Sequence, residues 1–250
     1  MDILLYFLGG VLAGICNATA GGGTFITFPL FVAQGINPIV ANLSSAVAIY
    51  PGHALGAYGY RKILIQKKLI KFKWVVLCLV GAIFGSYLLT IIENESFNQL
   101  VPILIALATC LFVFGNRLNI FLQKISTSSN KHQWVGDILL ILFSIYGSFF
   151  GAGLGVMLMA GLLIMGVDNI QHNNALKNAL GAIITFFSVI IFISAGLVDW
   201  KIATPTLLGA ILGGIWGAKI AQRLNVRVLK SVVIIIGIIL TFYYGYRVYG

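Results

Sequence analysis

Residues Asn17-Ala18-Thr19-Ala20-Gly21-Gly22-Gly23-Thr24-Phe25 place three consecutive glycines inside an apolar segment that is long enough to cross a bilayer. Glycine loosens a helix, and hydrocarbon cannot satisfy the backbone N–H and C=O groups that a break exposes. Irregular backbone at membrane depth is stable only where it is buried in protein or lines a cavity. Transporters bind their substrates at broken helices of this kind. The stretch therefore predicts a membrane transporter with the glycine break as part of its binding site.

The composition excludes a soluble globular domain. Of the 250 residues, 60% are hydrophobic and 9% are charged, whereas a soluble domain carries about 25% charged residues. The mean hydropathy is +1.02. Such a chain cannot cover its surface with polar groups, so lipid must be its solvent. We therefore expect an all-α integral membrane protein of the cell membrane.

Eight apolar segments follow one another along the chain, at residues 3–34, 40–60, 74–92, 99–115, 134–166, 172–197, 202–220 and 231–248. A single helix crosses the hydrocarbon core with about 20 residues. The first and the fifth segments are too long for one crossing, at roughly 45 Å of continuous helix, and glycines interrupt both. Each is expected to be glycine-broken or re-entrant, because its two legs of about 11–16 residues are too short to span alone.

The order of the segments indicates an internal repeat. Gly-Ala-Ile-Phe-Gly-Ser at residues 81–86 recurs as Gly-Ala-Ile-Leu-Gly-Gly at residues 209–214, and residues 35–42 have a counterpart at residues 166–173. We therefore divide the chain into a first transmembrane repeat, a polar linker and a second transmembrane repeat. Each repeat consists of a glycine-broken segment followed by three helices. The bounds of the three parts are residues 1–115, 116–133 and 134–250.

The charged loops bear on the orientation of the two repeats. Loop 61–73 holds six basic residues and linker 116–133 is also basic, so both are expected to be cytoplasmic. If both broken segments are re-entrant hairpins, the repeats are inverted and 13 of the 16 basic residues fall inside. If both cross the membrane, the repeats are parallel and 11 fall inside. The charge rule and the short legs favour inversion, which recurs among transporters built around broken helices.

Each glycine break starts a half-helix whose free N–H groups and positive dipole end form an anion site. These half-helices begin near Thr24 and Val156, and a two-fold axis would bring their ends face to face around a tetrahedral oxyanion. The competing interpretation is close helix packing, which explains Gly81, Gly85 and their counterparts in the second repeat. The candidate substrate-binding residues are the glycines of the breaks and nearby polar side chains, namely Asn17, Thr19, Gly21, Gly22, Gly23, Thr24, Asn42, Ser148, Gly151, Gly153, Gly155, Asn173 and Lys177.

Lys177 lies five or six residues into a predicted span, whereas Lys219 and Arg247 lie at the ends of theirs, and a charge within the membrane usually faces a cavity or a partner. The six acidic residues lie at or near the ends of spans, so an anionic substrate is the expected partner. Snorkelling of the long lysine stem to the interface is the alternative. Asn42 and Asn173 either line the cavity or cap helices. His53 is a candidate proton relay, although a lone histidine more often bonds to nearby backbone.

Other functional classes find no support in the sequence. It contains no metalloprotease, serine-hydrolase, nucleotide-binding or redox-dithiol motif, so we expect no enzyme activity and no cofactor. Cys16, Cys78 and Cys110 stand singly and match no metal-ligand spacing. The basic loop 61–73 is assigned to topology and lipid headgroups rather than to nucleic acid. The expected partners are a small anion and the lipid bilayer, and no oligomeric state follows from the sequence.

Residues 14–29, which include the triple glycine, resemble the first signature of the sulfite exporter TauE/SafE family of membrane permeases. Residues 37–42, 147–155 and 198–200 are similar to the same family, so the likeness covers nearly the whole chain. The resemblance implies movement of sulfite, sulfonates or related sulfur-containing anions. Members of the family often carry Ser or Thr where this chain has Phe149-Phe150, which implies a tighter or less polar site in the second repeat.

The sequence thus predicts a permease that exports a small sulfur-containing oxyanion by alternating access. A carrier of another small anion or carboxylate is the alternative within transport. A membrane scaffold or assembly factor is the alternative outside it. The glycine break distinguishes the two classes, because a scaffold has no need of irregular backbone at mid-bilayer.

Overall fold

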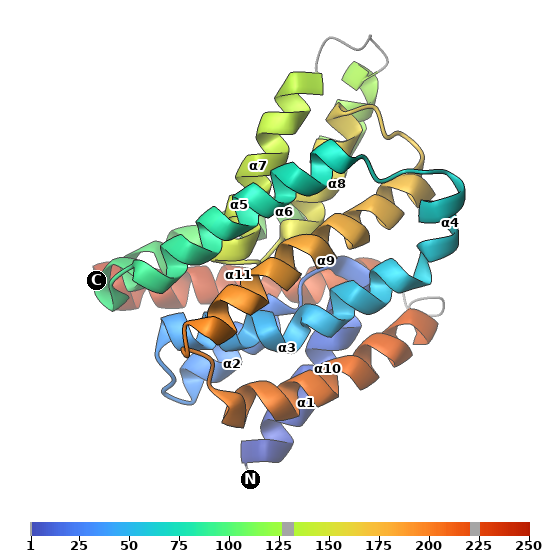
Figure 1. Ribbon diagram of the computed structural model, residues 1–250. Helices are drawn as coiled ribbons and strands as arrows, with labels where there is room; N and C mark the ends of the chain where they lie inside the picture. The colour runs from blue at the N-terminus through green and yellow to red at the C-terminus, as the bar shows by residue number, and fades with distance from the viewer. Residues whose placement is uncertain (1, 127–132, 221–225) are drawn as a thin grey trace.

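The computed structural model describes residues 2–126, 133–220 and 226–250, and it describes their side chains except those of residues 18–20, 116–126, 133, 217–220 and 226–230. Every regular element in these ranges is an α-helix (Figure 1), because only a helix satisfies its backbone groups within one segment. The helices are α1 (Asp2–Ala20), α2 (Thr24–Ala33), α3 (Pro38–Gly59), α4 (Arg61–Gln66), α5 (Phe72–Ile91), α6 (Asn94–Ser126), α7 (Gln133–Phe149), α8 (Leu154–Ile164), α9 (Ile170–Ser194), α10 (Trp200–Ile220) and α11 (Val226–Tyr249).

The all-helical membrane architecture predicted from the sequence is confirmed. Within the described residues, four helical stretches are long and apolar enough to cross a membrane, namely residues 72–91, 94–115, 170–194 and 231–249. Shorter apolar helices occupy the two glycine-broken segments. These four stretches coincide with four of the eight predicted segments.

The structure adds helix where the sequence suggested only a linker. α6 continues to Ser126, so it includes the first part of the stretch 116–133. The apolar residues of that part recur at helical spacing, at Leu118, Phe121, Leu122 and Ile125. This periodicity accounts for the extension, although the composition of the stretch is polar.

The two long segments break at their glycines, as predicted. α1 gives way to α2 at residues 21–23, and α7 gives way to α8 at residues 150–153. The backbone φ angle is 77° at Gly21 and 80° at Gly151 and at Gly153. A residue with a side chain is strained in this left-handed region by roughly 1–2 kcal/mol. Glycine therefore allows the chain to leave the helix at these points.

Each pair of half-helices folds back on itself with the glycines at its apex. In the first pair, the ring of Tyr6 in α1 packs edge-on against Phe31 in α2, with 5.8 Å between the ring centroids. In the second pair, Gly161 of α8 lies against the ring of Phe143 in α7. Residues early in one leg therefore contact residues late in the other. We call the pairs hairpin 1 (α1–α2) and hairpin 2 (α7–α8).

The first leg of each hairpin lies along a long helix. α1 lies along α10, and α7 lies along α5, with glycines at both interfaces. A Cβ atom at Gly213 would lie 2.0 Å from the carbonyl oxygen of Val11, and one at Gly85 would lie 2.2 Å from that of Ile145. The glycines one turn earlier are similarly close to the facing backbone. The packing interpretation of these glycines is confirmed, because no side chain fits between the helices.

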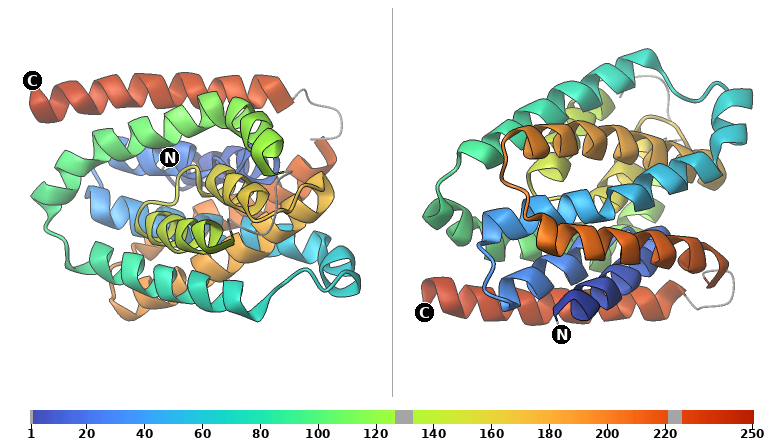
Figure 2. Two further views of the ribbon diagram at one scale, coloured as in Figure 1. Left: turned by 90° about the horizontal axis from the view of Figure 1, so that it is seen from above. Right: turned by 60° about the horizontal axis from the view of Figure 1, so that its bottom comes forward.

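Most of the helix termini lie at two ends of the molecule (Figures 1 and 2). We name one by the C-terminus and the other by its basic residues. Turn 34–37, turn 195–199 and the C-terminus lie at one end, the C-terminal end. Residues 60–71 and turn 165–169 lie at the other, the basic end, named for the lysines between α4 and α5. Hairpin 1 therefore opens toward the C-terminal end, and hairpin 2 opens toward the basic end.

α3 and α9 lie side by side in the centre of the molecule and run antiparallel (Figure 1). Tyr50 of α3 packs against Phe186 of α9, with 6.1 Å between ring centroids. Farther along α3, Gly56 lies against Asn178, nearer the start of α9. This pair of helices forms the wall against which the two hairpin apices pack.

Candidate functional site

The apices of the two hairpins meet inside the molecule. Gly21 of hairpin 1 faces Gly155 of hairpin 2, and a Cβ atom built on either one would lie 3.7 or 3.8 Å from the Cα atom of the other. Gly151 lies beside Thr24, whose Oγ1 would be 3.7 Å from a Cβ atom at position 151. Four of the candidate site residues thus come together from opposite halves of the chain.

Two half-helices begin at this contact without side-chain caps. Gly23 precedes α2 and Gly153 precedes α8, and no capping side chain accepts a hydrogen bond from the backbone N–H groups of either N-terminus. The backbone amides of Thr24, Gly153 and Gly155 donate to no atom in the described part of the chain. Free N–H groups and the positive ends of two helix dipoles therefore converge on one place, which is the arrangement that binds anions.

A small closed cavity, the central cavity, lies beside the apices and between α3 and α9. Its volume is about 10 Å³, which is room for about one water molecule. Five of the candidate residues line it, namely Thr24, Asn42, His53, Ser148 and Gly151. The structure is therefore closed around the site.

Two hydroxyl-bearing residues of the cavity wall are absent from the sequence-based candidates. Thr185 and Ser188 of α9 line the central cavity, and the Ser188 hydroxyl donates to the carbonyl oxygen of Ile184 at 2.9 Å. Together with Lys177 and Gly181 they recur at intervals of three or four residues, which places all four on one face of the helix. That spacing is the sequence signal by which they could have been found.

Asn42 joins two walls of the cavity, whereas Ser148 bonds mainly within its own helix. The Asn42 side chain donates from Nδ2 to the carbonyl oxygen of Phe149 at 2.7 Å, which fastens α3 to the end of α7. The Ser148 hydroxyl donates to the carbonyl oxygen of Ser144 at 2.8 Å. The Asn42 bond thus stabilises the closed arrangement of the hairpin apex.

Lys177 and His53 lie next to the apices. Cδ of Lys177 would be 3.6 Å from a Cβ atom on Gly155, so the lysine stem passes the N-terminus of α8. The ring of His53 packs against Gly181, one turn of α9 beyond Lys177, with Nδ1 3.3 Å from the Cβ position. A cation and an imidazole therefore lie beside the place where the two helix N-termini converge.

Gly22 and Gly153 take part in the breaks but face away from the central cavity. A Cβ atom at Gly22 would lie 3.2 Å from the ring of Phe112 and 3.2 Å from Val233. One at Gly153 would lie 3.5 Å from Ala108. Both positions therefore face α6 or α11, so their side of the backbone packs against helices.

Two polar candidates, Asn17 and Asn173, do not line the central cavity. The Asn17 amide lies against α3. Asn173 lies toward the basic end, where its Nδ2 donates to the carbonyl oxygens of Met159 and Val167, each at 3.2 Å. These bonds fasten the start of α9 to α8. The side chain of Thr19 lies outside the residues whose side chains are described.

A larger pocket opens at each end of the molecule, with a volume of about 400 Å³ in each case. The C-terminal pocket lies among turn 34–37, the start of α6 and the end of α11. The basic pocket lies between residues 68–74 and 165–172. A cluster rich in aromatic side chains fills the core on the side of the C-terminal pocket, and a largely aliphatic cluster fills it on the side of the basic pocket.

Comparison with known proteins gives one family over nearly the whole chain. The model of the family described as "Sulfite exporter TauE/SafE" matches residues 6–244. The chain is 27% identical over 247 residues to a "Probable membrane transporter protein" of Haemophilus influenzae, covering 96% of this chain and 94% of the relative. It is 28% identical over 237 residues to the "Probable membrane transporter protein YdhB" of Bacillus subtilis, covering 92% and 94%. No solved structure matches the chain significantly.

Proposed function

Because the chain belongs to the sulfite exporter TauE/SafE family, we propose that it is a permease that moves a small sulfur-containing oxyanion, such as sulfite or a sulfonate, across the cell membrane. The observation that carries the proposal is the contact of two uncapped helix N-termini through Gly21 and Gly155, with Lys177 beside them. The names of the relatives, which describe membrane transporters, support the same class of activity.

The chemistry of the contact favours an anion. Two helix N-termini each present roughly half a positive charge and several free N–H donors. The hydroxyl of Thr24 and the ammonium of Lys177 add donors nearby. In the described part of the chain, no carboxylate lines the central cavity. A tetrahedral or pyramidal oxyanion uses all of these donors at once, because its oxygens point in several directions.

The two repeats are inverted in our proposal, and the packing of the helices supports this. α1 packs along α10 through glycines, and α7 packs along α5 in the same way. In the repeat, α7 is the counterpart of α1, and α5 is the counterpart of α10. α3 and α9 are counterparts as well, and they run antiparallel. The hairpins open toward opposite ends, which supports two re-entrant segments of opposite orientation. The lysines of the basic end make it the cytoplasmic end, and the C-terminal end is then external.

Alternating access explains why the site is closed. The central cavity of about 10 Å³ lies between two pockets of about 400 Å³, as in a state in which neither side has access. If the packed core between the central cavity and one of the two pockets opened while the other stayed closed, the site would be exposed to that side alone. An anion that leaves an inside-negative cell gains about 2.3 kcal/mol per charge per 100 mV. Export therefore needs no carboxylate relay.

Purified protein in liposomes tests the proposal. With sulfite inside and an imposed potassium-diffusion potential, we expect anion efflux that follows the voltage when no pH gradient is present. Protein-free liposomes give the background. Flux that ignores voltage and follows a pH gradient would contradict the uncoupled mechanism and direct attention to His53. Flux of carboxylates but not of sulfite or sulfonates would support the other anion carrier, and absence of any anion flux would support a scaffold.

Lys177→Met is expected to weaken sulfite binding about tenfold, because it removes a charged donor from the partly buried surroundings of the anion. Lys177→Arg is expected to retain part of the affinity. The shift of the unfolding temperature with sulfite concentration measures this, since only a ligand that binds the folded state raises it. Lys201→Met, at an exposed lysine of the C-terminal end, is the matched control. Unchanged affinity in Lys177→Met would assign this lysine to snorkelling.

A further inference from the structure

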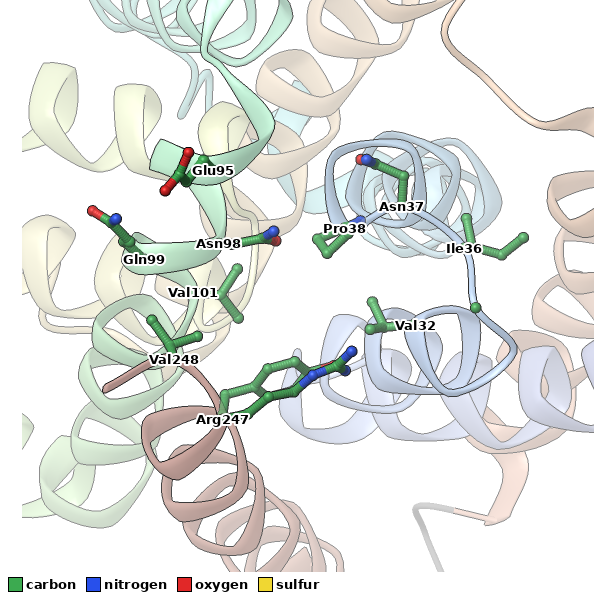
Figure 3. Close-up of a pocket in the computed structure, with 12 residues that line it drawn as sticks. Val32, Ile36, Asn37, Pro38, Glu95, Asn98, Gln99, Val101, Arg247 and Val248 are labelled. Carbon is green, nitrogen blue, oxygen red and sulfur yellow. The ribbon is translucent and has the colours of Figure 1, made fainter. Parts of the chain in front are cut away.

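The C-terminal pocket is lined by charged and amide side chains from α6, α11 and turn 34–37 (Figure 3). Arg247 of α11 lies on one wall, and Glu95, Asn98 and Gln99 of α6 lie on the opposite wall. Arg247 and Glu95 are both exposed to the pocket and form no ion pair with each other in the described structure. The pocket therefore offers a guanidinium fork to a visiting oxyanion, which is the geometry that sulfonates and carboxylates prefer.

The carboxylate of Glu95 opposes the charge of Arg247 in the same pocket. A site with one cation and one anion holds an oxyanion only weakly. Weak binding suits a station on a transport route, because an ion must be able to leave as well as enter. The amide groups of Asn98 and Gln99 add polar contacts without adding charge.

Three aromatic rings separate this pocket from the central cavity. Tyr244 lines the C-terminal pocket, and its ring lies 6.2 Å from that of Phe28, centroid to centroid. Phe28 packs edge-on against Phe150 at 5.6 Å, and Phe150 lines the central cavity. All three side chains are buried, with exposures of 6%, 1% and 3%. The rings therefore form a continuous stack from one space to the other.

We propose that the C-terminal pocket is a weak anion-binding station at the external mouth of the transport route, and that Tyr244, Phe28 and Phe150 form the gate between it and the central cavity. The inference rests on the proposed function, since it assumes that the anion passes through the central cavity. Arg247 receives the anion when the rings rotate aside, and Glu95 shortens its stay. Phe150 comes from hairpin 2 and Phe28 from hairpin 1, so a movement of either hairpin apex opens the stack.

Thiol accessibility tests the gate without requiring transport. The reporter is Ala46→Cys, on the wall of the central cavity, in a background in which the three native cysteines are replaced by alanine. A membrane-impermeant anionic methanethiosulfonate is added from the side of the C-terminal end. Phe28→Ala is expected to raise the labelling rate about tenfold or more, because it removes the middle ring of the stack.

Phe31→Ala is the matched control for the gate. Phe31 lies on the same helix and is fully buried, but its ring packs against Tyr6 of α1. It should therefore lose similar packing without opening the path to the C-terminal pocket. Equal acceleration in both variants, or no acceleration in Phe28→Ala with the protein still folded, would overturn the gate.

Flux measurements with external sulfite test the station. Arg247→Gln is expected to raise the half-saturation concentration about fivefold, and Glu95→Gln to lower it about twofold, as exposed charges allow. Lys201→Gln, at the same end but outside the pocket, should change neither. An unchanged value in Arg247→Gln, or a higher value in Glu95→Gln, would overturn the station. Absence of flux in the wild-type protein would instead contradict the permease itself, whereas the thiol measurement would still report on the gate.

Discussion

Gly155→Leu is expected to abolish anion transport while leaving the protein folded. A Cβ atom at this position meets only ordinary contacts, at 3.6 Å from Cδ of Lys177 and 3.8 Å from Cα of Gly21. The backbone therefore tolerates a small side chain, and Gly155→Ala should keep part of the activity. The larger leucine side chain occupies the space between the two apices and covers the N–H groups of α8. Sulfite flux in liposomes, together with the thermal unfolding curve, measures both consequences.

Gly214→Leu is the control for this variant. Gly214 is also a helical glycine, but a Cβ atom there has no neighbour within 4 Å, so transport should persist. Normal flux in Gly155→Leu would mean that the anion does not pass between the apices. The binding site would then have to be sought elsewhere in the protein.

The second large effect is expected at the interface of α1 and α10. In Gly213→Ala the new Cβ atom would lie 2.0 Å from the carbonyl oxygen of Val11, so the two backbones must separate. Overpacking of this kind costs about 3 kcal/mol of the free energy of unfolding, and two facing backbones cannot rotate away as a flexible side chain can. Because α1 is the first leg of hairpin 1, the same shift should also move the hairpin apex and reduce transport.

Gly214→Ala, at the adjacent residue of the same helix, separates this effect from helix propensity. Its Cβ atom enters open space, so the free energy of unfolding should change by no more than about 1 kcal/mol. Denaturation of both variants in the same detergent gives the comparison. Equal stability would show that α1 and α10 are not held at the distance seen in the structure.

The places where the chain leaves the helix were predictable from the sequence. Three adjacent glycines at residues 21–23 and three alternating ones at residues 151–155 are local features, and their effect depends on allowed φ angles rather than on neighbours. The membrane environment follows from composition in the same way. The family could also be predicted from the sequence, because residues 14–29 resemble its first signature within one continuous stretch.

The aromatic stack was not predictable. Phe28, Phe150 and Tyr244 lie in three distant segments, and each one alone looks like an ordinary apolar residue of a membrane helix. The helical spacing of Thr185 and Ser188 places them on one face of α9. That spacing does not show that this face lines the cavity. Contacts between segments depend on how the helices pack, which no local pattern records.

The order of residues alone is enough to predict an all-helical membrane protein with two glycine-broken segments. The role of each glycine depends instead on how the helices pack. Gly21 and Gly22 are neighbours, yet Gly21 touches the opposite apex and Gly22 packs against Phe112 and Val233. A break depends on the conformational freedom of one residue. Which neighbour that residue faces depends on how whole helices are rotated against one another.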